Sequence, residues 1–315
     1  MSTRENPPRD QPRAPAVLGV LGGSGLYDLD GLEGREERLV DTPFGSPSGP
    51  LTVGFIDGAP VVFLARHGRH HRLGPSEINS RANIHAMKQL GVSRLLSVSA
   101  VGSLREGIPP GDLVLVDQLI DRTHRRENTF FADGVVGHVS FAEPTCRGFD
   151  DAVAAVATAS GHALAPPEAR GLAAAPGPHL HRGGTYVCME GPQFSTRAES
   201  RLHRAWGADV IGMTAAPEAK LAREAELCFS LLALSTDYDC WREGEDPVTA
   251  ESVLAVLRAN VARASRIVRE LAPYAAGRGW TCGCGRAAEN AILTARAGIS
   301  PAARDRLELL YGRYL

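Results

Sequence analysis

Residues 18–26 read Leu18-Gly19-Val20-Leu21-Gly22-Gly23-Ser24-Gly25-Leu26, and the rest of the chain is organised around them. An apolar run ends there in glycines and one hydroxyl, the composition of a buried strand that turns and presents N–H groups to an anion. Asp28 stands where a dinucleotide fingerprint needs its third glycine, and a Walker-type loop needs a Gly-Lys pair that the stretch lacks. A phosphate held at Ser24 and an ordinary strand-to-loop turn both fit.

Composition narrows the class of protein. The 315 residues are 43% hydrophobic, enough for a sizeable core, and a net charge of −2 gives no field to attract nucleic acid or an anionic membrane. Residues 1–15 are proline-rich without an apolar segment, which is typical of a disordered tail rather than a signal peptide. Six cysteines are too few for a dense disulfide framework, so we expect a cytoplasmic protein. Cys282 and Cys284 are then free thiols in a loop, or alternatively a strained redox pair.

Short apolar runs alternate with helical patterns along the chain. Several runs are nearly continuous in Val, Leu and Ile, the pattern of strands buried on both faces. They are residues 17–21, 60–65, 94–98, 112–116, 185–189, 209–213 and 228–235, with helices predicted over 76–90, 196–206 and 249–271. This alternation indicates one α/β domain over residues 16–272, after the tail at 1–15. Residues 273–315 form a C-terminal extension, expected to be a loop with short helices that pack on the domain.

Four of the predicted strands end in hydroxyls or cations, namely Ser24, Arg66–His67, Ser99–Ala100 and Thr214. Strand ends open into the ligand crevice of an α/β sheet, so these residues are expected to converge. An arginine fork gives bidentate hydrogen bonds to an anion, and hydroxyls with the Ala100 amide fill the remaining oxygens. Each hydroxyl alone is more simply a turn residue, but together the residues predict a phosphate site.

Asp237 and Asp239 follow the strand predicted over 228–235. Two residues apart in an extended chain, their side chains point to the same side. Like charges in a partly desolvated crevice cannot both ionise freely, so one pKa is expected to rise, which is how a general acid is made. The alternative is a pair of loop acids that cap a turn or bind a divalent ion.

Two further stretches contain residue types that can bind a flat ligand or a metal ion. Phe194 follows a strand and a Gly-Pro turn, where it offers an aromatic face to a flat heteroaromatic ligand or else fills the core. Three histidines lie within residues 67–71, but no carboxylate or cysteine completes a ligand set at metal spacing. The flanking arginines also oppose a cation, so we expect no metal there.

Several separated motifs together resemble the purine nucleoside phosphorylase superfamily, and within it the 5′-methylthioadenosine phosphorylase branch. They are GGSGL at 22–26, DTPFG at 41–45, ARHG at 65–68, GSLR at 102–105, the segment 117–122, EGP at 190–192, FS at 194–195, MT at 213–214 and TDYDCW at 236–241. The resemblance covers about residues 17–272. It implies a single α/β domain with a twisted, partly barrel-like mixed sheet flanked by helices. It also implies a homotrimer and phosphorolysis without metal or organic cofactor, with inorganic phosphate as co-substrate.

The resemblance also implies roles for individual residues. It places phosphate at Ser24, Arg66, His67, Ser99, Ala100 and Thr214. It puts Met213 against the ribose, Phe194 and Ser195 in the base pocket, Asp237 and Asp239 on the purine, and His138 near the 5′ group of a neighbouring subunit's substrate. Gly212 departs from the polar residue that several members carry there, which is expected to loosen contacts near the ribose.

The implied reaction splits S-methyl-5′-thioadenosine into adenine and 5-methylthioribose 1-phosphate, a step of methionine and purine salvage. Asp237 would protonate or stabilise N7, and Asp239 would accept from the 6-amino group, so a 6-oxopurine would leave buried acceptors unsatisfied. The branch that uses guanine and hypoxanthine has Asn and Glu in place of Asp237 and Ser195. The alternatives are a phosphorylase for 6-oxopurine or 5′-hydroxyl nucleosides, a dinucleotide-dependent oxidoreductase, and a non-catalytic nucleoside-binding protein.

Overall fold

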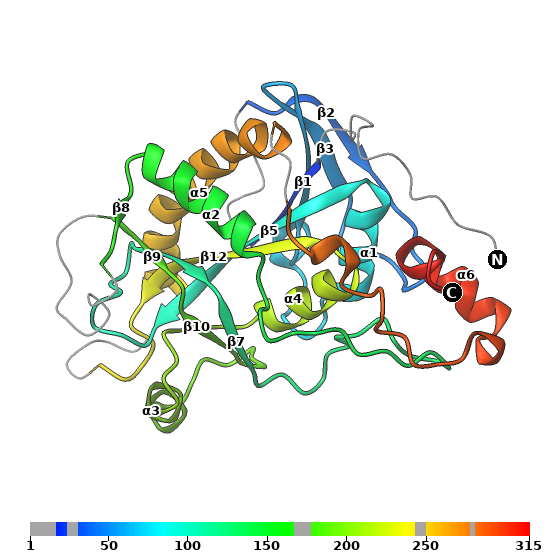
Figure 1. Cartoon of the computed structure of the whole chain (residues 1–315). Coiled ribbons are helices and arrows are strands. Elements are labelled where there is room, and N and C mark those ends of the chain that lie inside the picture. Colours follow the sequence, from blue (N-terminus) through cyan, green and yellow to red (C-terminus); the bar gives the residue numbers. More distant parts are fainter. Residues whose placement is uncertain (1–16, 24–30, 167–177, 243–249, 278–280) are drawn as a thin grey trace.

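The computed structural model describes residues 17–23, 31–166, 178–242, 250–277 and 281–315 (Figure 1). Ser24 and the tail at 1–15 lie outside these residues. In the described part of the chain, no helix is both long and apolar enough to cross a bilayer. What is described is one mixed sheet with helices on both faces.

Three parallel strands form the centre of the sheet. They are β1 (Val17–Gly22), β5 (Val92–Ser103) and β12 (Cys228–Asp237), with β5 between the other two. Their side chains are almost all buried, which confirms the prediction from the continuous apolar runs. Both β5 and β12 continue beyond their predicted ends at 98 and 235, because their pairing runs on to Gly102 and Asp237. Ser99 and Ala100 therefore lie inside a strand and not after it.

The remaining strands extend the sheet on both sides of this centre in the order β2-β3-β4-β1-β5-β12-β6-β9-β8. They are β2 (Glu33–Arg38), β3 (Leu51–Ile56), β4 (Ala59–Ala65), β6 (Leu113–Val116), β7 (Gln118–Asp121), β8 (Ala163–Leu164), β9 (His179–Arg182), β10 (Thr185–Cys188) and β11 (Val210–Gly212). The sheet is mixed, as expected, but the strands of the described residues do not close it into the partly barrel-like form that was expected.

One edge of β5 changes partner part-way along its length. Up to Val98 this edge pairs with β1, and from Gly102 it pairs antiparallel with β11, which carries β10 and β7 beyond it. Among the described residues, no strand pairs with residues 99–101 on that side. The sheet therefore opens beside Ser99 and Ala100.

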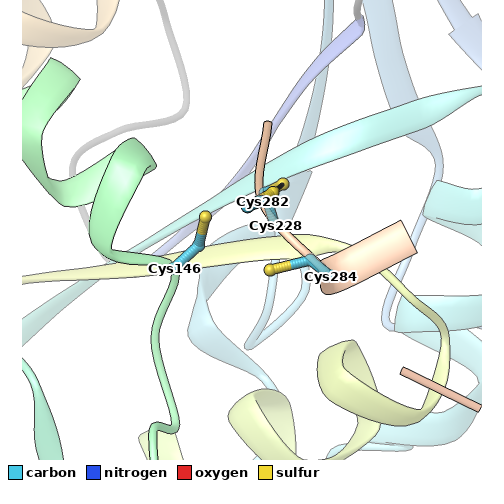
Figure 2. A group of neighbouring side chains, drawn as sticks. All are labelled: Cys146, Cys228, Cys282 and Cys284. Atoms are coloured by element: carbon cyan, nitrogen blue, oxygen red, sulfur yellow. Dashed lines mark hydrogen bonds between the residues drawn. The ribbon is translucent and has the colours of Figure 1, made fainter. Parts of the chain in front are cut away.

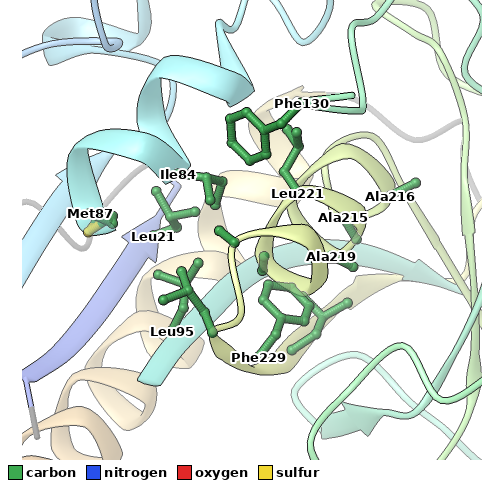
Figure 3. Packing of buried hydrophobic residues seen from close by; sticks show 14 of the residues in the cluster. Leu21, Ile84, Met87, Leu95, Phe130, Ala215, Ala216, Ala219, Leu221 and Phe229 are labelled. Carbon is green, nitrogen blue, oxygen red and sulfur yellow. The ribbon is translucent and has the colours of Figure 1, made fainter. Parts of the chain in front are cut away.

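Helices cover the two faces of the sheet. On one side α1 (Ser80–Gln89), α4 (Ala215–Glu224) and α6 (Pro301–Tyr311) share an apolar cluster that includes Ile84, Leu221 and Phe229 (Figure 3). On the other side α2 (Arg147–Ala159) and α5 (Ala250–Ala276) pack on a second cluster. The remaining helix is α3 (Arg197–Ala205), which begins with the predicted capping box between Thr196 and Glu199.

The C-terminal end of the domain differs from its prediction. Helix α5 was expected to stop at 271, but it continues past Pro273 to Ala276. Ala272 and Ala275 are buried there, so packing outweighs the N–H that proline lacks. Residues 281–315 then cross to the opposite face, where α6 buries Tyr311 with its ring stacked on Phe131 at 4.8 Å.

Candidate active site

A cavity of about 660 Å³ opens at the gap beside β5. Residues far apart in the sequence line it, and they include Gly23, Arg66, His67, Ser99, Ala100, Phe194, Met213, Thr214, Asp237 and Asp239. The convergence predicted from the strand ends is therefore present for Arg66, His67, Ser99, Ala100 and Thr214. Ser24 lies outside the described residues, next to Gly23.

Small polar groups gather at one end of the cavity. The hydroxyl oxygens of Ser99 and Thr214 are 3.3 Å apart, although 115 residues separate them. Thr214 is the N-cap of α4, and its side chain makes no capping hydrogen bond there. The first amides of a helix attract anions through both their N–H groups and the helix dipole. This end of the cavity is therefore suited to a phosphate.

Arg66 differs from its predicted geometry. Its side chain is almost fully buried, and Nε and Nη2 form a bidentate pair with Glu218, at 2.6 and 3.2 Å from the two carboxylate oxygens. Nη1 donates to the carbonyl of Val98 at 2.7 Å, which is its one acceptor among the described residues. The expected fork on phosphate is therefore wrong, because a buried guanidinium needs its own counter-charge. A single N–H of Nη1 remains for a ligand, on the side where Gly23 lies.

His67 lies beside Arg66 as a neutral ring. Burial, together with the charge of Arg66, lowers the pKa of His67 to about 4. Nδ1 lies 2.9 Å from the carbonyl of Leu73, which can only accept, so the proton sits on Nδ1. Nε2 is then an acceptor. His67 can take a hydrogen bond from a protonated phosphate oxygen or a hydroxyl, but it cannot donate one.

Asp237 and Asp239 both line the cavity, but the chain between them does not have the extended conformation that was predicted. Asp237 ends β12, but Asp239 has φ +51°, so the chain is not extended between them. The Asp239 N–H instead turns back and donates to Asp237 Oδ1 at 2.8 Å, while the Thr236 hydroxyl donates to Oδ2 at 2.7 Å.

A pKa does rise in this pair, as predicted, and burial is the main cause. The pKa of Asp239 is raised by desolvation, which outweighs the hydrogen bonds that lower it. Its Oδ2 is buried without a hydrogen-bond donor anywhere in the described ranges. A buried acceptor without a donor is costly, so this oxygen is a place for a ligand N–H or for a proton.

Three other predicted residues have different surroundings. Phe194 lines the cavity with half of its surface exposed. Ser195 does not line the cavity; its hydroxyl is 3.8 Å from Met189 Sδ, and its side chain is also one of the hydrogen-bonding neighbours that lower the pKa of Asp239. His138 is exposed in a loop whose N–H donates to the carbonyl of Ala291 at 2.9 Å, and it does not line the cavity of its own chain. A role in a neighbouring subunit stays a prediction.

The sequence reasoning missed Arg126, which joins three parts of the wall. Its guanidinium is buried and donates to the main-chain carbonyls of Met213, Met189 and Glu190. Burial alone would raise the pKa of the Glu190 carboxyl, but hydrogen bonds from Ser76 and the His124 amide, with the charge of Arg126, hold it at about 2. Only the position of Glu190 within a motif signalled this network.

Tyr186 was also missed, and it explains Gly212. The buried Tyr186 hydroxyl lies 3.5 Å from Ser99 Oγ and 3.4 Å from the Thr214 amide nitrogen. A Cβ at Gly212 would lie 2.1 Å from that hydroxyl oxygen. The Tyr186 hydroxyl therefore fills the space beside Gly212, and the looser contacts expected near the ribose stay a prediction.

Comparison with known proteins shows to which family the chain belongs. The model of the phosphorylase superfamily matches residues 17–273. The chain belongs to the phosphorylase superfamily. Members of this superfamily are pentosyltransferases, so the chain is an enzyme, and neither an oxidoreductase nor a silent binding protein.

Individual relatives in the superfamily are similar over nearly their whole length. S-methyl-5′-thioadenosine phosphorylase of Geobacter sulfurreducens is 50% identical over 95% of this chain and 99% of its own, and that of Koribacter versatilis is 50% identical over 95% and 97%. A methylthioadenosine phosphorylase from an antarctic soil metagenomic library superposes with a TM-score of 0.86 at 41% identity, over 95% and 99% of the two chains. The enzyme of Schistosoma mansoni in complex with adenine gives 0.78 at 36%, over 84% and 93%.

Proposed function

We propose that the protein catalyses the phosphorolysis of S-methyl-5′-thioadenosine to adenine and 5-methylthioribose 1-phosphate. One observation carries the proposal. A single cavity holds the Ser99 and Thr214 hydroxyls at the N-terminus of α4, together with the acid pair Asp237 and Asp239. An anion site and a base-reading acid pair in one cavity are what phosphorolysis of a purine nucleoside requires. The names of the similar enzymes support the choice of substrate.

Phosphate is the first participant in the proposed reaction. We expect it to accept hydrogen bonds from Ser99, Thr214, the Ala100 amide and the free N–H of Arg66, with Ser24 completing the site. A protonated phosphate oxygen can donate to His67, whose Nε2 is an acceptor. As the glycosidic bond lengthens, the ribose develops positive charge, which the phosphate dianion stabilises before it bonds to C1′.

The leaving purine is the second participant. It gathers negative charge at N7, and Asp237 supplies a proton or a hydrogen bond there. Asp239 Oδ2, which lacks a donor among the described residues, accepts from the 6-amino group. A 6-oxo group would meet this acceptor with a lone pair, so adenine is preferred. Phe194 bounds the base, Ser195 acts on it only through Asp239, and Met213 packs on the ribose.

The chemistry of these steps requires no metal or organic cofactor, because phosphate itself is the nucleophile and the electrostatic stabiliser. We further propose a cytoplasmic homotrimer in methionine and purine salvage. In such a trimer His138 reaches the 5′ end of the substrate bound by a neighbour. The exposure of His138 away from its own cavity supports this arrangement.

The decisive experiment measures purine release from S-methyl-5′-thioadenosine, adenosine and inosine, with and without phosphate. We expect S-methyl-5′-thioadenosine to be cleaved fastest, and only when phosphate is present. Release without phosphate would make the enzyme a hydrolase and overturn the anion site at Ser99 and Thr214. Faster release from inosine would instead overturn the role of Asp239.

A further inference from the structure

Four cysteines from three distant parts of the chain meet at one point (Figure 2). Cys146 is the N-cap of α2, Cys228 begins β12, and Cys282 and Cys284 lie in the C-terminal extension. Their four Sγ atoms all lie within 4.8 Å of one another, and each is a free thiol. The sequence showed only the close pair in the extension, because the fold alone brings the other two to it.

We propose that these four cysteines bind one structural zinc ion. In a tetrahedral thiolate site the Zn–S bonds are about 2.3 Å, which places the sulfurs roughly 3.8 Å apart. The Sγ atoms of Cys228 and Cys282 are 3.3 Å apart, and the other pairs stay inside the 4.8 Å limit. Only small rotations of the side chains separate this cluster from a closed four-sulfur site, the ligand set that selects zinc in structural positions.

Cationic groups surround the four sulfurs. The Arg223 guanidinium donates to Cys284 Sγ at 3.7 Å. The buried Arg94 guanidinium lies near the other three sulfurs, and their electrostatic attraction favours its charged form. The N-terminus of α2, a helix of 13 residues, adds its dipole at Cys146. Zinc with four thiolates carries a net charge of −2, and a buried charge of this size needs such counter-charges.

Binding is an exchange of protons for metal without change of redox state. Each thiol loses its proton to solvent as its sulfur bonds to Zn²⁺, so up to four protons leave for one ion bound. Cys146 and Cys284 are buried, whereas Cys282 is exposed, which gives the ion a path from solvent.

The site lies away from the proposed chemistry. Cys228 and Asp237 stand at opposite ends of β12, which places them roughly 30 Å apart. The ion therefore takes no part in phosphorolysis and joins the extension to α2 and β12. Its presence is independent of the proposed function.

The test is the metal content of the full chain, purified without added metal under anaerobic conditions. We expect about one zinc per chain, and close to none in Cys282→Ser/Cys284→Ser, which alters only the extension. Cys240 lies outside the cluster, so the Cys240→Ser variant is the matched control and should keep its zinc. A zinc-free wild-type protein, a zinc-free control, or one iron per chain in place of zinc would each overturn the proposal.

A second measurement uses the wild-type protein and does not depend on how the variants fold. Exchange of the ion for Co²⁺ should produce the visible bands of tetrahedral thiolate coordination, and a chelator added at low pH should abolish them. The same chelator should expose four additional reactive thiols per chain. Four cysteines already joined in two disulfides, detected as a mass lower by four hydrogens, would contradict the site.

Discussion

At the scale of single residues, Gly212 and Tyr186 form a matched pair. A methyl group at 212 would overlap the Tyr186 hydroxyl, which supports Ser99 and Thr214. Gly212→Ala is therefore expected to raise the KM for phosphate about tenfold, a loss of about 1.4 kcal/mol. Steady-state kinetics at varied phosphate measure this effect. Tyr186→Leu in the same chain should restore part of the affinity, and an unchanged KM in the single variant would show that the tyrosine moves freely.

Asp237 allows a sharper test of the base site. Asp237→Asn keeps an oxygen for the Asp239 N–H but cannot supply a proton, so turnover of S-methyl-5′-thioadenosine should fall by about 10²- to 10⁴-fold. Discrimination against S-methyl-5′-thioinosine should weaken at the same time. Asp57→Asn, in an exposed turn, is the matched control. Equal rates of purine release by Asp237→Asn and the control would remove Asp237 from the mechanism.

The sequence predicted residues at strand ends better than residues that support them. Thr214 and Asp237 could be found because polar groups follow apolar runs there, and Ser99 was found by the same rule although it lies inside β5, beside the gap in its pairing. The bidentate partner of Arg66 could not, since Glu218 lies 152 residues away inside a helix and shows no pattern of its own. Arg126 and Tyr186 were missed for the same reason, because their partners are main-chain groups and hydroxyls that only the fold brings near.

At the scale of elements, Arg126 joins the turn after β10 to the end of β11 through the carbonyls of Met189, Glu190 and Met213. A lysine is a point charge and cannot span three carbonyls with fixed geometry. Arg126→Lys should lower kcat/KM about 10- to 100-fold, because Met213 and the base wall lose their relative placement. Arg182→Lys, in an exposed ion pair with Asp151, is the control. Equal kinetics in both variants would show that the wall is held by other contacts.

The boundaries of elements were harder to predict than their existence. The central strands could be read from continuous Val, Leu and Ile, but their last residues depend on pairing with neighbours, as β5 and β12 show. Strand β2 was missed because all six of its residues are exposed and most are charged, as suits an edge strand. Helix α5 passed its expected end because burial of alanines outweighs one proline.

At the scale of the whole molecule, one buried acid links stability to pH. Glu224 accepts hydrogen bonds from the Phe130 amide and the Thr129 hydroxyl, and burial raises its pKa from 4.5 to about 7. The fold thus favours the protonated acid. Its contribution to stability is fully present below pH 4.5 and is lost as the pH rises through about 7.

Glu224→Gln should remove this dependence, because the neutral amide keeps both neighbours hydrogen-bonded. Urea unfolding at several pH values between 4 and 9 compares the two proteins. Relative to wild type, the variant should gain up to about 3 kcal/mol between the acidic and the alkaline end. Parallel stability curves would mean that Glu224 titrates normally in the folded protein.

Strands β5 and β12 pair without interruption from Arg94 with Cys228 to Ala100 with Leu234, and this pairing limits the motion of the cavity floor. Backbone amides in such a buried ladder exchange with solvent only when the whole domain opens. The floor of the cavity, which carries Ser99 and Ala100, is therefore fixed on the time scale of a catalytic cycle. Substrate entry and product departure must therefore depend on the walls of the cavity, to which the half-exposed Phe194 belongs.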